Sequence, residues 1–238
     1  MRSFSDLSPQ PLWSYFSDIL KIPRPSKEEG KIMAWLLAFA ARHGLEARKD
    51  DAGNVLITKP ATPGREDVPV VVLQTHLDMV CEKNSDKVFD FNTDPIEGVI
   101  GEEWVSANGT TLGADDGIGI AAQLAVLTAT DLQHGPIECL FTVDEETGLT
   151  GANALQPGFF NGKILLNLDS EDEGEIFIGC AGGIDTVAEF QYQEEAVPAG
   201  DLALQLSVSG LTGGHSGDDI HKGLGNANKI LARFLRSA

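Results

Sequence analysis

The chain has 238 residues, 42% of them hydrophobic, which is enough for one large domain or for one domain and part of another. With 36 acidic against 17 basic residues the formal net charge is −19, which disfavours nucleic acid and anionic membranes as partners. The sequence contains no apolar run long enough to span a membrane and no apolar segment of a signal peptide near its start, so we expect a cytoplasmic protein. The three cysteines are widely spaced, which favours reduced thiols over disulfides.

Two helices are predicted at the start of the chain. Ser8 and Pro9 begin an amphipathic run that continues to Leu20. A second run ends at Gly44 and is preceded by Ser26 and Glu29, whose spacing is that of a capping box.

Short apolar runs follow and predict a buried sheet. Four of them are candidate strands, at residues 55–57, 68–73, 137–143 and 164–168. A glycine-rich stretch leads into a helix at 121–128. Continuously apolar strands that alternate with helices indicate an α/β sheet covered on both faces.

The pattern changes after Gly182. Residues 186–192 and 202–208 alternate apolar and polar side chains, which predicts half-exposed strands, and residues 225–234 predict a helix. These elements bury little apolar surface by themselves, so we expect a catalytic domain over residues 1–184 and only the beginning of a second domain over residues 185–238.

Potential metal ligands follow three of the predicted strands. His76 and Asp78 follow one strand, Glu145 and Glu146 follow the next, and Asp169 follows the last. A further acidic pair, at residues 115–116, precedes the glycine-led helix. Because ligands bind at the carboxyl ends of strands in open α/β sheets, these side chains are expected at one edge, where crowded carboxylates repel unless cations neutralise them.

Each motif also has a purely structural interpretation. A histidine at a strand end can be a core residue, and acids beside glycines often cap helices or sit in solvated turns. In the adjacent pair Glu145 and Glu146, one carboxylate can bind metal while the other acts as a base, and spacing leaves open which does which.

The proposed donor set contains imidazole and carboxylates. It suits Zn, Mn or Co better than a thiolate-seeking ion. Since one ion needs about four ligands, the supply suggests two ions that share one bridging carboxylate. Such sites polarise a scissile carbonyl and activate a water.

These motifs, in this order, resemble those of the M20 metallopeptidases. The resemblance rests on HLD at 76–78, GADDG at 113–117, DEETG at 144–148 and NLDS at 167–170, and it extends through residues 7–13, 178–185 and 213–217. It implies a zinc-exopeptidase-like mixed sheet flanked by helices, with the beginning of an inserted α+β lid and dimerisation domain.

The resemblance also implies a role for each residue. His76 and Asp169 would bind one zinc ion, Asp115 would bridge the two ions, and Glu146 would bind the second. Asp78 would orient His76. Glu145 would be the general base, and His215, in the lid, would reach toward the substrate.

The implied reaction is hydrolysis of unblocked dipeptides, Xaa-His-like and broader, by a homodimer with two zinc ions per site, for which Mn or Co could substitute. The alternatives are another M20 amidohydrolase (a tripeptidase, an aminoacylase-like deacylase or a carboxypeptidase) or, for this chain alone, a non-catalytic metal-binding module. The family completes its second ion site with a downstream histidine that has no counterpart here. We therefore expect the N-terminal half of an enzyme about twice this length, with little activity of its own.

Overall fold

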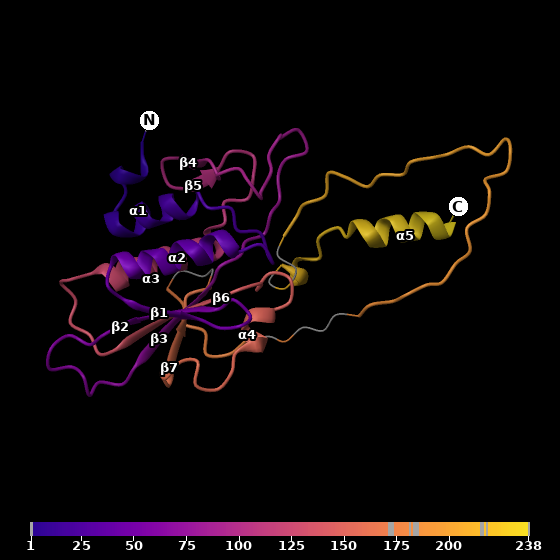
Figure 1. Ribbon diagram of the computed structural model, residues 1–238. Helices are drawn as coiled ribbons and strands as arrows, with labels where there is room; N and C mark the ends of the chain where they lie inside the picture. Colours follow the sequence, from indigo (N-terminus) through magenta and orange to yellow (C-terminus); the bar gives the residue numbers. More distant parts are fainter. Residues whose placement is uncertain are drawn as a thin grey trace. The chain divides into compact units, whose positions relative to one another are not determined.

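The computed structural model describes residues 2–170, 174–180, 182, 186–214, 217 and 219–237 (Figure 1). The chain divides into two units, Met1–Ile176 and Phe177–Ala238. The domain border predicted between residues 184 and 185 lies outside the described residues and stays a prediction.

A five-stranded mixed sheet forms the centre of the first unit. Its strand order is β1-β2-β6-β3-β7. The strands are β1 (Glu46–Lys49), β2 (Val55–Lys59), β3 (Val71–His76), β6 (Ile137–Thr142) and β7 (Ile164–Asn167). The strands β6, β3 and β7 are parallel to one another, whereas β1 and β2 are antiparallel to their neighbours. The predicted α/β fold with a mixed sheet is therefore confirmed.

Three helices cover one face of this sheet, as Figure 1 shows. They are α1 (Gln10–Ile19), α2 (Gly30–Arg42) and α3 (Ala114–Thr128), and a short 3-10 helix, η1 (Phe4–Asp6), precedes them. Their apolar side chains form the main core with alternate strand residues, among them Ile57, Cys139 and Phe141. This burial explains the apolar stripe predicted for the first two helices.

A smaller core covers the opposite face. Leu56, Val72 and Leu140 are buried there against Leu155 and Phe159, which follow the short helix α4 (Thr150–Ala154). Because the central strands are buried on both faces, their sequences are continuously apolar.

A two-stranded hairpin of β4 (Gly98–Ile100) and β5 (Val105–Ala107) completes the first unit.

The capping box predicted for α2 is wrong. Glu29 is itself the N-cap residue, and its side chain makes no capping hydrogen bond. Instead, the Glu29 carboxylate accepts hydrogen bonds from the backbone N–H groups of Lys27 and Asp144, and the Ser26 hydroxyl donates to Asp78. Partners brought close by the tertiary fold have replaced the local pair.

The second unit contains η2 (Ile220–Lys222) and α5 (Ala227–Ser237) among its described residues. The helix α5 confirms the helix predicted at 225–234. The strands predicted at 186–192 and 202–208 are wrong, because the described residues of both segments form no β-ladder. An alternating pattern gives a strand only where a partner strand supplies hydrogen bonds. None of the described helices is both long and apolar enough to cross a membrane.

Candidate metal centre

The parallel part of the sheet brings the predicted ligands to one edge. Strand β3 ends at His76, the segment after β6 carries Glu145 and Glu146, and the segment after β7 carries Asp169. The first turn of α3 adds Asp115. Side chains that lie far apart in the sequence therefore share the carboxyl edge of the sheet, as expected for an α/β site.

His76 lies at the centre of this group. Its imidazole is buried, with Nε2 at 2.9 Å from an oxygen of Asp115 and 3.8 Å from an oxygen of Asp169. The other ring nitrogen, Nδ1, lies 3.2 Å from an oxygen of Asp78. Ligand atoms of His76, Asp115 and Glu146 all lie within 4.8 Å of one another. One imidazole and several carboxylates thus face a common point.

Asp78 is a fully buried carboxylate that connects two motifs. Its two oxygens accept the backbone N–H groups of Glu145 at 3.0 Å and Glu146 at 3.1 Å, besides the Ser26 hydroxyl at 2.7 Å and the His76 ring. Burial opposes its charge, but the hydrogen bonds from His76 and its other donors outweigh burial and hold the pKa of Asp78 well below its usual value. Asp78 therefore fixes the imidazole and the Glu145-Glu146 backbone together.

Asp144 organises the loop from which the two glutamates project. Its carboxylate accepts hydrogen bonds from the Thr147 and Thr150 hydroxyls, and its backbone has a positive φ of 52°. The group of ligand atoms that lie within 4.8 Å of one another around His76 includes Glu146 but does not include Glu145. Both glutamates are half-buried, and burial raises the pKa of the Glu145 carboxyl. The geometry thus distinguishes two residues that spacing alone left equivalent.

The two acidic residues at the start of α3, Asp115 and Asp116, also differ in burial and in their partners. Asp115 is about half exposed and faces His76, whereas Asp116 is buried and accepts the backbone N–H of His76 at 3.2 Å. Neither caps the helix, because the N-cap residue is Gly113. A Cβ at Gly119 would lie 2.1 Å from an Asp116 oxygen, so the place of Asp116 depends on that glycine.

Three carboxyl groups at this edge hold protons more strongly than usual, whereas the hydrogen bond with His76 lowers the pKa of Asp115. Burial, reinforced by the nearby Asp115, raises the pKa of Glu146 to about 7 and that of Asp169 to about 6. Burial also raises the pKa of Asp116 to about 8. Protons thus limit the repulsion among these groups, and a divalent cation would do so as well.

The same carboxylates also change the pKa of His76. Its burial lowers the pKa, but hydrogen bonds with Asp115 and Asp78 more than compensate and raise the pKa of His76 to about 10. The imidazole acts here as the cation of the cluster, in the place where a metal ion would supply positive charge.

The structure thus brings together His76, Asp78, Asp115, Glu146 and Asp169, with Glu145 beside them. His215 lies outside the described residues, so its role stays a prediction. Sequence reasoning missed Arg24, a buried side chain that donates to the backbone of two ligand-bearing segments. The only signal for Arg24 was a cation between two prolines in an apolar context.

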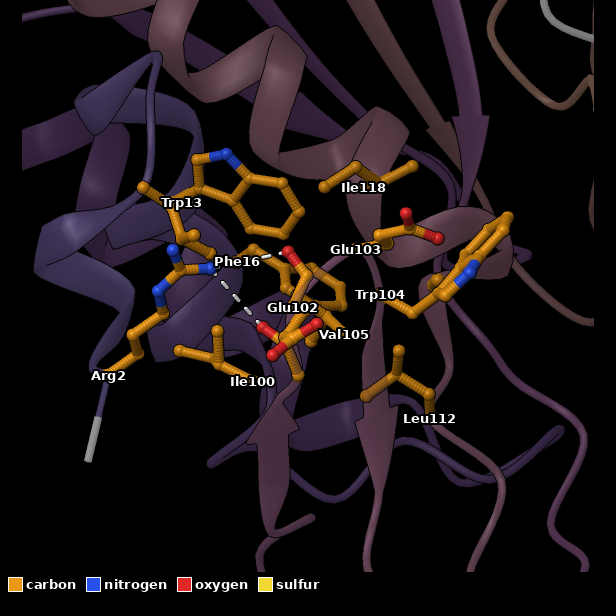
Figure 2. A pocket seen from close by; sticks show the side chains of 13 residues that line it. Arg2, Trp13, Phe16, Ile100, Glu102, Glu103, Trp104, Val105, Leu112 and Ile118 are labelled. Carbon is orange, nitrogen blue, oxygen red and sulfur yellow. Dashed lines mark hydrogen bonds between the residues drawn. The ribbon is translucent and has the colours of Figure 1, made fainter.

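An apolar cavity of about 280 Å³ borders the first turns of α3 (Figure 2). Trp13, Phe16 and Trp104 line it, together with Ala114 and Ile118 of α3. None of the candidate metal ligands is among its lining residues, so it is distinct from the candidate metal centre.

Comparison with known proteins identifies the family. Residues 72–210 match the model of peptidase family M20/M25/M40. The chain belongs to this family. The resemblance inferred from the motifs is confirmed. The matched family is a family of peptidases.

Individual relatives agree with this assignment. The chain is 53% identical to the cytosol non-specific dipeptidase of Escherichia coli (strain K12) over 99% of its length and 48% of the relative's. The crystal structure of aminoacylhistidine dipeptidase from Vibrio alginolyticus matches with a TM-score of 0.75 and 47% identity, over 98% of this chain and 48% of that one. A tripeptidase from Staphylococcus aureus matches with a TM-score of 0.59 and 26% identity, over 68% of this chain and 44% of that one. This chain spans about half the length of these relatives.

Proposed function

We propose that this chain supplies the general base and most of the metal ligands of a metal-dependent peptidase that hydrolyses unblocked dipeptides. The observation that carries the proposal is the convergence of His76, Asp115 and Glu146 within 4.8 Å at the carboxyl edge of the sheet. The relatives from E. coli and V. alginolyticus, both named as dipeptidases, support the substrate class.

The donor set fits zinc. It combines one imidazole with several carboxylates, which zinc, and also manganese or cobalt, accepts. Burial and the charge of the nearby Asp115 raise the pKa of Glu146 and of Asp169, and a bound cation would relieve this repulsion. His76 and Asp169 would hold one ion, Glu146 the second, and Asp115 would bridge them. When bound, two such ions would polarise the peptide carbonyl and acidify a water.

Glu145 is the proposed general base. Its backbone N–H donates to Asp78, and its carboxylate is not part of the group formed by His76, Asp115 and Glu146, which supports a role in proton transfer. A raised pKa brings its proton affinity closer to neutral pH, which suits a group that takes a proton from water and delivers it to the departing amine. Asp78 would hold the His76 ring in the orientation that turns Nε2 toward the ions.

The remaining parts of the proposal concern the whole protein. We propose that His215 contacts the substrate from a lid domain that begins near residue 185, and that the lid joins two subunits. We also propose a cytoplasmic location. These points are supported by the family resemblance and by the name of the E. coli relative, a cytosol non-specific dipeptidase.

A comparison of three substrates tests the proposed reaction. The protein containing this chain is supplied with Zn²⁺ and given a dipeptide, a tripeptide with the same first two residues, and the corresponding N-acetyl amino acid. We expect at least a tenfold higher kcat/KM for the dipeptide. Preference for the tripeptide or the N-acetyl compound would identify another activity of the family, and metal binding without turnover of any of the three would identify a non-catalytic metal-binding module.

A further inference from the structure

Arg24 lies in the segment between α1 and α2 and is one of the largest fully buried side chains of the chain, with 2% of its surface exposed. A guanidinium loses its hydration when it is buried, and this cost is tolerated only where hydrogen bonds replace the lost water. Its position therefore calls for a reason beyond packing.

The guanidinium bridges two segments that carry candidate ligands. Its Nη1 donates to the carbonyls of Leu77 at 2.9 Å and Asp78 at 2.6 Å, directly after His76. Its Nη2 donates to the carbonyl of Gly113, two residues before Asp115. A single rigid group thus joins the end of β3 to the beginning of α3.

The backbone around the guanidinium is adapted to it. A Cβ at Gly113 would lie 2.7 Å from Nη2 of Arg24, and a Cβ at Gly117 would also lie 2.7 Å from that atom. Gly113 has a positive φ of 68°, which suits glycine for a second reason, whereas Gly117 lies in α3 without such a φ. At Gly117 the space taken by Arg24 is the main feature that calls for glycine, and Phe16 is the next neighbour of such a Cβ, at 3.2 Å.

We infer that Arg24 is a positioning residue that sets the separation between His76 and Asp115 and thereby the affinity of the metal centre. This inference rests on the proposed function. The planar fork of an arginine fixes two backbone segments at once, which the single ammonium of a lysine cannot do. Because coordination tolerates only small errors in the positions of the ligands, a loosened fork lowers affinity although every ligand is still present.

Titration of the protein containing this chain with Co²⁺ alone tests the inference, with calorimetry for affinity and the visible spectrum for coordination. In Arg24→Lys the charge is kept and the fork is lost, so we expect at least tenfold weaker binding and an altered spectrum. Gly117→Ala keeps Arg24 but displaces its guanidinium, and we expect a change in the same direction.

Two matched controls separate positioning from stability. Like Arg24, Lys59 donates hydrogen bonds to two partly buried backbone carbonyls, those of Val126 at 2.7 Å and Ala129 at 2.6 Å. These carbonyls lie at the C-terminal end of α3, away from Asp115. Gly30 lies in the first turn of α2, and a Cβ there would meet nothing within 4 Å. We expect Lys59→Met and Gly30→Ala to bind Co²⁺ with unchanged affinity.

Each outcome decides between the two ideas. If the unaltered protein containing this chain binds no Co²⁺, the proposed function fails. If it binds and the Arg24→Lys and Gly117→Ala variants bind equally well, only the inference about Arg24 is overturned, and the same holds if Lys59→Met weakens binding as much as Arg24→Lys. If Arg24→Lys does not fold, as judged by circular dichroism, Gly117→Ala alone decides.

Discussion

At the scale of single residues, the candidate centre depends on how buried carboxylates are satisfied. Asp116 accepts the backbone N–H of His76, and Asp78 contacts the His76 ring and accepts the backbone N–H of Glu145. The carboxylates of Asp115 and Asp169 instead lie near Nε2 of His76. Residues of the same chemical type therefore perform different tasks, according to the donors that surround them.

Replacing Asp78 by asparagine should lower the stability of the metal-free chain. An asparagine has one acceptor oxygen, whereas the two oxygens of Asp78 together accept four hydrogen bonds in the unaltered chain. Some of these buried donors then lose their acceptor, so we expect a loss of about 2–4 kcal/mol in the free energy of unfolding at pH 7. Because the pKa of Asp78 is depressed in the folded chain, its stabilisation is present above pH 3.8 and is lost as the pH falls below that value. In urea unfolding, the difference in the free energy of unfolding between Asp78→Asn and the unaltered chain should therefore become smaller below about pH 4.

Asp18→Asn is the matched control for this change. Asp18 pairs with Lys21 at 2.8 Å on the surface of α1, and loss of such a pair should cost less than about 0.5 kcal/mol. Equal effects of the two substitutions would contradict the connecting role of Asp78.

Metal binding should release protons. With pKa values of about 6 for Asp169, about 7 for Glu146 and about 10 for His76, the metal-free cluster holds protons at pH 6.5 that an ion must displace. Affinity for Zn²⁺ should therefore rise between pH 6 and pH 8, by about tenfold per pH unit for each proton released. Calorimetry in two buffers with different ionisation enthalpies counts these protons, and heats that do not depend on the buffer would contradict the prediction.

At the scale of elements, the sheet sets the positions of the ligand segments through a few buried polar contacts. Asn54, just before β2, is fully buried, and its side chain accepts the N–H of Val143 at 3.1 Å and donates to the carbonyl of Gly151 at 2.8 Å. It therefore holds the two ends of the segment that contains Glu145 and Glu146.

Asn54→Ala should lower the free energy of unfolding by about 2–4 kcal/mol, because it leaves buried backbone groups without partners. Thermal unfolding measures the effect. The control is Asn153→Ala, since Asn153 is exposed and its contact with the Gly148 carbonyl is long, at 3.5 Å; we expect a change within about 0.5 kcal/mol there. A smaller effect at Asn54 than at Asn153 would contradict the assignment.

The elements next to the site could be predicted from the sequence because they are strongly patterned. The strands β2, β3, β6 and β7 contain the predicted apolar runs, although β3 begins at Val71 and continues to His76 rather than ending at residue 73. The ligand motifs lie at or just after the ends of three of them. Strand β1 was missed because Glu46–Lys49 is polar and shows no apolar alternation, and the three-residue strands of the β4–β5 hairpin are too short to give a pattern.

The details of the site depend on tertiary contacts that spacing does not encode. The different places of Glu145 and Glu146 follow from the turn at Asp144, with its positive φ, and from the hydrogen bonds to Asp78. The same holds for the failed capping box, because the Ser26 hydroxyl donates instead to Asp78, which lies in the segment after β3.

At the scale of the whole molecule, the first unit explains why a chain that spans about half the length of its relatives holds so many candidate metal ligands. One sheet edge gathers the histidine, the carboxylates and the proposed base, and the family match at residues 72–210 covers all of these positions. In the proposed reaction Glu146 holds metal and its neighbour Glu145 moves the proton.

Metal content and dipeptide turnover, measured together for Glu145→Gln and Glu146→Gln in the protein containing this chain, test that claim most directly. We expect Glu145→Gln to lower kcat by at least about a hundredfold while it retains nearly all bound zinc, because only the proton acceptor is lost. We expect Glu146→Gln to lose zinc and turnover together. Loss of zinc in Glu145→Gln, or full metal content in Glu146→Gln, would contradict the account.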